Sequence, residues 1–85
     1  MAEGKRIGKI THYYDKIGVA VVEVESPFGV GDFIEIRDKN GETRFGQEVS
    51  SLQIEHVNVQ KVTEGQLVGL KVEQRVKRGD LVFKL

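Results

Sequence analysis

Apolar and polar residues alternate along this chain with the period of two that is typical of β-strands, whose successive side chains point to opposite faces of a sheet. In the segment 19–24, Ala20, Val22 and Val24 occupy the positions that should point inward. No stretch of ten residues shows the 3.6-residue period of an amphipathic helix. The pattern predicts about six or seven strands and no long helix, with strands at residues 7–14, 19–24, 32–37, 42–49, 51–57, 67–72 and 81–84.

Strict alternation also assigns side chains to faces. In the first predicted strand it places Ile10 and Tyr14 on one face and Ile7 and Tyr13 on the other. In the third predicted strand it turns Arg37 toward water. In the segment 51–57 it places Leu52, Ile54 and His56 on a common face of one strand.

One phrase, apolar-x-x-Gly-(Asp/Gln)-apolar-apolar, occurs three times, at residues 28–34, 62–68 and 76–82. Glycine accepts the positive φ of a tight turn, and the Asp or Gln after it can accept hydrogen bonds from turn amides. The apolar residue three positions before the glycine can fold back onto the core. Each copy predicts a turn that begins a strand, with Gly31, Gly65 and Gly79 in the turns and Ile34, Val68 and Val82 inside.

Composition indicates one soluble domain of modest size. The chain has 85 residues, of which 39% are hydrophobic and 31% charged, and this balance suits a folded domain with one core. Val and Ile outnumber Leu, which favours strands. The chain begins without an apolar signal stretch, and its longest apolar run, residues 19–22, is too short to cross a membrane. We therefore expect a cytoplasmic protein.

Charge is balanced in total but unevenly distributed. Thirteen basic residues oppose thirteen acidic ones, whereas dedicated nucleic-acid binders are usually basic. Residues 1–18 and 71–85 are net positive, and residues 19–70 carry four basic and nine acidic residues. We expect the basic residues of the two ends to converge and the acidic middle to form the opposite surface.

A basic and aromatic cluster in the first predicted strand could stack on unpaired RNA bases. The alternative is that one of its two adjacent tyrosines belongs to the core and that the lysines serve only solubility. Together with basic residues near the other end, the candidate RNA-binding or partner-binding residues are Lys9, His12, Tyr13, Tyr14, Lys16, Lys71, Arg75, Lys77 and Arg78.

The sequence offers no pattern for catalysis or for a cofactor. Cysteine is absent, and the two histidines, His12 and His56, lack the spacing of a metal site. Ser50 and Ser51 are close to His56 only in sequence. No glycine-rich phosphate loop followed by Lys and Ser or Thr occurs, so we expect no nucleotide, no cofactor, no metal and no enzyme activity.

The three repeated turns resemble a known barrel. The segment VTEGQLVGLKV (62–72) resembles the second half of domain 2 of translational GTPases such as elongation factor Tu. FGVGDFIEI (28–36) resembles the earlier turn and strand of that domain, and VKRGDLV (76–82) its closing one. The resemblance implies an all-β fold, a small closed antiparallel Greek-key-like β-barrel that forms a single domain over residues 1–85, with residues 1–5 disordered.

Two further segments narrow the resemblance. IGKITHYYDKIGVA (7–20) and VSSLQIEH (49–56) are similar to small stand-alone translation elongation factor-like proteins. They are also similar to the C-terminal barrel of the collagenase-like peptidase family, which includes enzymes implicated in RNA hydroxylation. The sequence contains neither the GTP-binding domain of the translational GTPases nor the catalytic region of the collagenase-like peptidases. A shared architecture does not by itself transfer a function.

Three functions follow from these observations. The favoured hypothesis is a non-enzymatic binding module that docks on RNA, a ribosomal surface or a translation-linked protein. The alternative is an accessory domain that recruits substrate for a separately encoded collagenase-like peptidase or RNA-modifying enzyme. A third is a structural protein that oligomerises through an exposed strand edge.

Overall fold

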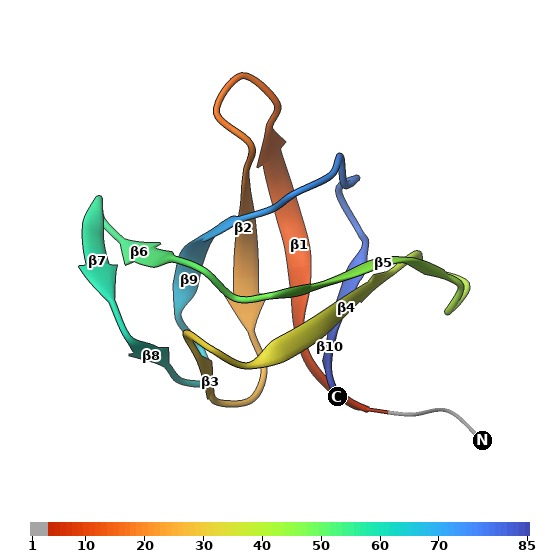
Figure 1. Cartoon of the computed structure of the whole chain (residues 1–85), viewed down its shortest axis with the longest axis horizontal. Coiled ribbons are helices and arrows are strands. Elements are labelled where there is room, and N and C mark those ends of the chain that lie inside the picture. Colours follow the sequence, from red (N-terminus) through yellow and green to blue (C-terminus); the bar gives the residue numbers. More distant parts are fainter. Residues whose placement is uncertain (1–3) are drawn as a thin grey trace.

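The computed structural model describes residues 4–85, which form ten β-strands and no helix (Figure 1). The prediction of an all-β protein is confirmed, although the strands are more numerous than expected. No described segment is a helix long and apolar enough to span a membrane. The strands are β1 (Lys5–Tyr14), β2 (Val19–Val24), β3 (Phe28–Gly29), β4 (Phe33–Arg37), β5 (Thr43–Glu48), β6 (Leu52–Ile54), β7 (Val57–Val59), β8 (Lys61–Val62), β9 (Leu67–Lys71) and β10 (Leu81–Lys84).

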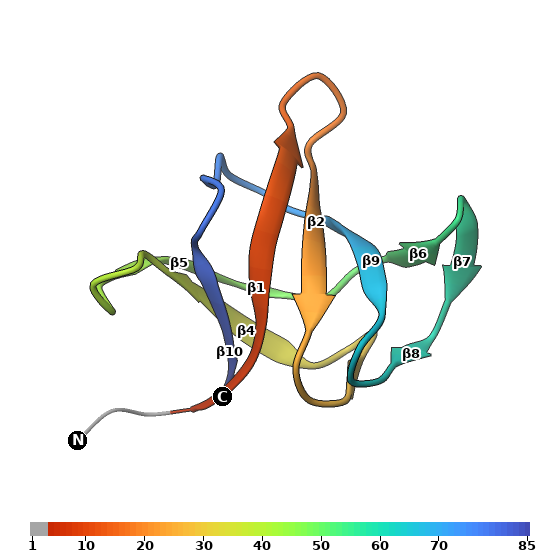
Figure 2. The same ribbon diagram turned by 180° about the vertical axis from the view of Figure 1, so that it is seen from behind.

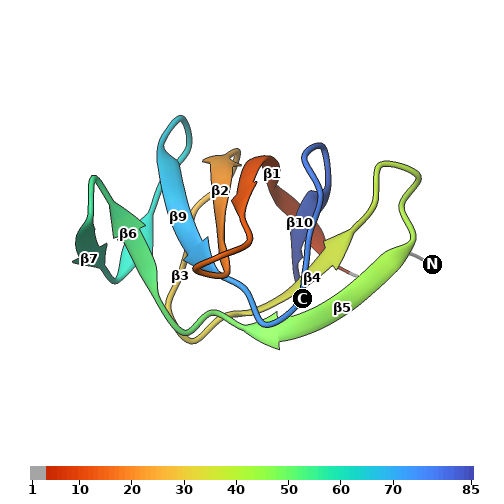
Figure 3. The same ribbon diagram turned by 90° about the horizontal axis from the view of Figure 1, so that it is seen from above.

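Eight strands form one antiparallel sheet in the order β5-β4-β10-β1-β2-β9-β6-β7, and β3 pairs separately with β8. Seen from above, the sheet curls so that β4 and β5 lie across from β1, β2 and β9 (Figure 3). No backbone ladder among the described residues joins the two outer strands, β5 and β7. The expected closed barrel is therefore wrong in this respect, because the sheet curves but its ladder stays open.

The three glycine turns each hold a distant residue, in a strand or just after one, by a reciprocal pair of backbone hydrogen bonds. The Gly79 amide donates to the Ile10 oxygen at 2.8 Å, and the Ile10 amide donates to the Asp80 oxygen at 2.8 Å. The same pair joins Gly31 and Asp32 to Val49, and Gly65 and Gln66 to Val24. These contacts tie the turns to the sheet where no ladder continues.

The turn residues behave as the repeated phrase predicts. The φ angles of Gly31, Gly65 and Gly79 are 96°, 90° and 95°. The side chain after each glycine accepts a hydrogen bond at 2.8 Å from the amide three residues before it, as Asp80 does from Lys77. The strand residues expected inside are fully buried, and so are the apolar residues that open each phrase: Ile34, Val68, Val82, Phe28, Val62 and Val76.

Two β-bulges change the faces of the first strand. The register of β1 shifts against β10 between Arg6 and Gly8, and against β2 between Ile10 and His12. A bulge inserts one residue and so reverses the alternation beyond it. Ile7 and Ile10 are consequently both buried, and Tyr13 packs against the same core. Strict alternation predicted the wrong faces for these side chains, because it does not allow for the residue that a bulge inserts.

Arg37 is buried, with only 8% of its surface exposed, although the alternation predicts that it faces water. Its guanidinium lies over the Phe83 ring, 4.0 Å from the centroid. Its Nε donates to Glu35 Oε1 at 2.6 Å. The long apolar stem and the flat cation of an arginine allow it to cover an aromatic ring on a sheet.

The expected disordered segment, residues 1–5, is only partly within the described chain. Residues 1–3 lie outside it. Lys5 begins β1 and pairs with Lys84, so the expectation is wrong at this residue. The C-terminus consequently lies beside the start of β1 (Figure 1).

Candidate partner-binding groove

A groove of about 270 Å³ runs over the outer face of β2 and β9, between the β1–β2 turn and the β6–β7 turn. From behind, β2 and β9 lie side by side and β6 flanks β9 (Figure 2). Most of the lining is apolar and comes from both hairpins and from the two strands between them. Its main members are Tyr14, Ile17, Val19, Val21, Leu67 and Gly69.

The floor of the groove is low because it contains a glycine. Gly69 pairs with Val21 on one side and with Gln53 on the other. A Cβ added at Gly69 would lie 3.3 Å from Val19 Cγ1, so even a methyl group would crowd the floor. The absence of a side chain here creates a depression between two half-buried valines.

The walls include side chains that a monomeric domain usually buries. Tyr14, Ile17 and Leu67 are 49%, 59% and 57% exposed. Single exposed apolar residues are normal, but a group of them around one depression marks an interaction surface. The His12 ring lies next to the Tyr14 ring, with centroids 4.4 Å apart, and extends this aromatic surface along β1.

The wall on the β6–β7 side is a strained turn. β6 and β7 are joined by the two residues Glu55 and His56, whose φ angles are 51° and 68°. Such two-residue hairpins normally use Asn-Gly, because a side chain at positive φ costs roughly 1–2 kcal/mol. Strain of this kind is often retained where a turn contributes to a site.

The sequence analysis missed this hairpin and predicted one strand over residues 51–57. The prediction is wrong because no glycine, asparagine or proline marks the turn. His56 consequently does not share a strand face with Leu52; it is exposed in the turn, whereas Leu52 is buried.

Several residues predicted to bind RNA or a partner gather at the tip of the β1–β2 hairpin. Lys71 Nζ donates to the Ile17 oxygen at 2.8 Å, and Arg75 Nη2 lies 3.7 Å from Asp15 Oδ2. Lys16 is exposed in the same turn. Tyr14 is on the surface there, whereas Tyr13 packs against the core.

The other predicted residues lie elsewhere. Lys9 is exposed in the middle of β1, opposite Leu81 of β10 and Glu23 of β2. Lys77 and Arg78 line a separate cleft near the start of β10. The candidate set is therefore divided among at least two surfaces.

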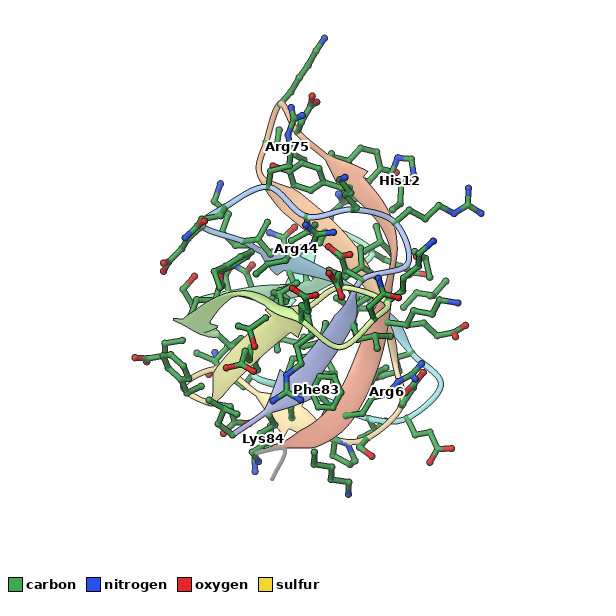
Figure 4. The ribbon with its side chains drawn as sticks, turned by 90° about the vertical axis from the view of Figure 1, so that its right-hand side faces the viewer. Arg6, His12, Arg44, Arg75, Phe83 and Lys84 are labelled. Carbon is green, nitrogen blue, oxygen red and sulfur yellow. The ribbon has the colours of Figure 1, made fainter. Side chains whose placement is uncertain are left out.

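The structure does not separate the charges into a basic surface and an opposite acidic surface, as the sequence predicts. Figure 4 shows Arg75 and His12 near one end of the molecule, and Arg6 and Lys84 near the other. Two acidic residues of the chain's middle pair with these terminal cations. Arg6 Nε lies 2.8 Å from Glu25 Oε1, and Lys84 Nζ lies 3.5 Å from Asp32 Oδ2. Acidic and basic side chains are thus interleaved at this end.

The described residues contain no group of three or more histidines, cysteines or carboxylates placed to hold a metal ion. Buried side-chain nitrogen and oxygen atoms in the same part of the chain all have hydrogen-bond partners.

The chain resembles proteins described as proteases and collagenases. No protein-family model matches it. It is 36% identical over 80 residues to an uncharacterized protease of Methanocaldococcus jannaschii, a match covering 93% of this chain and 19% of the relative. It is 30% identical over 79 residues to a collagenase of Porphyromonas gingivalis, covering 92% of this chain and 22% of the relative. The chain thus spans about a fifth of the length of these relatives.

Solved structures show the same fold. The C-terminal domain of a putative U32 peptidase from Geobacillus thermoleovorans superimposes with a TM-score of 0.84 at 22% identity, over 93% of this chain and 90% of that one. Its selenomethionine variant gives a TM-score of 0.86 over 94% and 99%. The expected similarity to collagenase-like C-terminal domains is supported, while none of these findings shows a likeness to domain 2 of elongation factor Tu.

Proposed function

We propose that this domain is an accessory module that recruits or orients substrate for a collagenase-like peptidase, and that the groove is its contact surface. The observation that carries the proposal is the unequal coverage of the sequence match. The match takes in 93% of this chain but only 19% of the M. jannaschii protease. Most of that relative lies outside the segment that this chain resembles.

The groove has the chemistry for holding an extended polypeptide segment. Its exposed apolar walls gain free energy when a partner removes them from water, at roughly 25 cal/mol per Å² of apolar surface. The Gly69 depression admits a side chain between the two walls. Gln53 and the Glu55–His56 turn supply polar atoms at the edge, which can fix the orientation of a bound segment.

The test is a cleavage assay with a collagenase-like peptidase from the same cell and gelatin as substrate. Adding this domain should raise kcat/KM, and Leu67→Ser or Ile17→Ser should reduce that effect. Leu85→Ser is a matched control, because Leu85 is also an exposed leucine, at 51% compared with 57% for Leu67. The proposal fails if the domain leaves kcat/KM unchanged, or if the Leu85 variant loses as much as the Leu67 variant. An RNA-modifying enzyme of the same family can be assayed with the same three variants.

RNA docking is a second candidate function, supported by one specific feature. The paired rings of His12 and Tyr14 lie at a hairpin tip that also carries Lys16 and the ends of Lys71 and Arg75. An exposed aromatic ring with cations around it is the surface on which unpaired bases stack. This candidate also rests on the resemblance of the repeated turns to the barrel of translational GTPases.

A further inference from the structure

We propose that a second site, a cleft of about 260 Å³ between the β4–β5 turn and the loop that precedes β10, binds a phosphate group. The cleft shares no lining residue with the groove, so the two proposals are independent. Its charged lining comes from two segments that are far apart in sequence. These residues are Asp38, Lys39, Arg44, Lys77, Arg78 and Asp80.

At the centre of the cleft, Arg44 is held in a fixed orientation by Asp80. Arg44 Nε and Nη2 donate to the two Asp80 carboxylate oxygens at 2.8 Å and 3.2 Å. The Asp80 side chain is only 3% exposed, and it also accepts the Lys77 amide at 2.8 Å. Asp80 is therefore immobilised from both sides, and it positions the guanidinium above it.

Arg44 keeps donors available for a ligand. A guanidinium carries five N–H groups in a rigid plane, and the bonds to Asp80 use only its Nε and Nη2 edge. Its side chain is 32% exposed and lines the cleft (Figure 4). A pre-oriented guanidinium of this kind suits the oxygens of a phosphate.

The other cations of the cleft have no carboxylate partner. Lys39, Lys77 and Arg78 form no ion pair with any described residue. The remaining acid, Asp38, instead accepts the backbone amides of Asn40 and Glu42 at 2.8 Å and 3.0 Å. Four cationic side chains thus face two engaged carboxylates.

This surplus of positive charge selects the ligand. A phosphate dianion would balance two excess charges, whereas a single carboxylate would balance one. The cleft also has space, since a Cβ added at Gly79 would meet no atom within 4 Å. A purely structural role accounts for the Arg44–Asp80 pair, but it does not account for three unpaired cations gathered around that pair.

The test is a titration followed by amide chemical shifts, using inorganic phosphate, a nucleoside monophosphate and a short single-stranded RNA at low ionic strength. We expect shifts at residues 38–44 and 77–80, and affinity for phosphate about tenfold weaker in a Lys39→Ala/Arg78→Ala variant. A Lys5→Ala/Lys61→Ala variant removes the same charge at exposed positions away from the cleft and should bind as the parent does. Arg44→Lys keeps the positive charge but loses the planar array of guanidinium N–H donors. It should therefore weaken phosphate binding as well.

The three ligands separate the sources of the phosphate. Equal affinity for all three indicates recognition of the phosphate alone, and much tighter binding of RNA indicates a nucleic-acid backbone; both outcomes support the site. The absence of shifts at millimolar phosphate, or equal losses in the cleft variant and the control variant, would overturn the proposal. Thermal melts of each variant establish that a loss of binding is not a loss of folding.

Discussion

Gln47 and Lys71 join two parts of the sheet that no backbone ladder connects. Gln47 Nε2 donates to the Lys71 oxygen at 2.8 Å, and Gln47 Oε1 accepts the Glu73 amide at 2.8 Å. Gln47 lies on the edge strand β5 and is 3% exposed, while Lys71 ends β9. One side-chain amide therefore replaces part of the closure that a continuous barrel would have.

Replacing Gln47 by leucine should consequently destabilise the domain. Leucine has a similar volume but removes the partner of the Lys71 carbonyl and of the Glu73 amide at a partly buried site, which costs about 1–3 kcal/mol. The free energy of unfolding in urea measures this cost. Gln53→Leu is the matched control, because Gln53 is exposed and its amide contacts only Asn58. A Gln47 variant as stable as the control would show that this amide does not hold the sheet together.

The comparison of sequence and structure explains why Gln47 was not predicted. Hydrophobic alternation and the repeated glycine phrase depend on local residues, and both predicted their elements correctly at Gly31, Gly65 and Gly79. The amide of Gln47 acts across 24 residues, and nothing near it in the sequence marks its partner. The bulges in β1 and the β6–β7 hairpin, which has no glycine, were not predicted for a related reason. Tertiary packing overrides the local sequence pattern at these positions.

The candidate groove was predictable only in part. The basic and aromatic segment predicts that one of Tyr13 and Tyr14 is exposed, but it does not indicate which of the two. Leu67 and Gly69 were assigned to a strand, but their exposure depends on which strands lie beside β9 in the sheet. The order β2-β9-β6 arises from long-range pairing, which a single sequence does not reveal.

The strained turn at Glu55 and His56 gives a prediction about both stability and binding. Replacing the pair by Asn-Gly should raise the free energy of unfolding by about 1–2 kcal/mol, because both positions have positive φ. The same change removes two side chains from the edge of the groove, so the stimulation of the peptidase should fall. A variant that is more stable and equally active would show that the groove does not use this turn.

Acid should weaken the contacts of Glu35. The hydrogen bond from Arg37, on the same strand, holds the pKa of Glu35 below its usual range, and Thr43 of β5 adds a second bond, although partial burial opposes the shift. The unfolded chain therefore binds this proton more readily than the native one. The contribution of Glu35 to stability is complete above its unfolded pKa, and it disappears as pH falls through the native value.

The melting temperature as a function of pH tests this contribution. Between about pH 5 and pH 3, Glu35→Gln should lose less of its melting temperature than the parent protein does. Glu48→Gln serves as the control, because Glu48 is exposed and forms no ion pair among the described residues. Equal acid sensitivity in all three proteins would contradict a stabilising role for Glu35.

The hairpin tip provides the test of RNA docking. If single-stranded RNA stacks on the exposed ring of Tyr14, then Tyr14→Ala should weaken binding by roughly 1–3 kcal/mol. Binding should also fall steeply as salt is added, since each phosphate contact releases counterions. Fluorescence anisotropy of a labelled RNA at several salt concentrations measures both effects.

Charge reversals then locate the contact. Lys16 is in the turn next to Tyr14, and Lys16→Glu should weaken RNA binding. The double variant Lys9→Glu/Lys16→Glu should abolish binding, because two cations of the β1–β2 hairpin become anions. Lys61→Glu makes the same change at an exposed lysine of β8 and should have little effect. If Lys61→Glu weakens binding as much as Lys16→Glu, the attraction is general and no hairpin site exists. If the parent protein binds no RNA even at low salt, RNA docking at the hairpin tip is excluded.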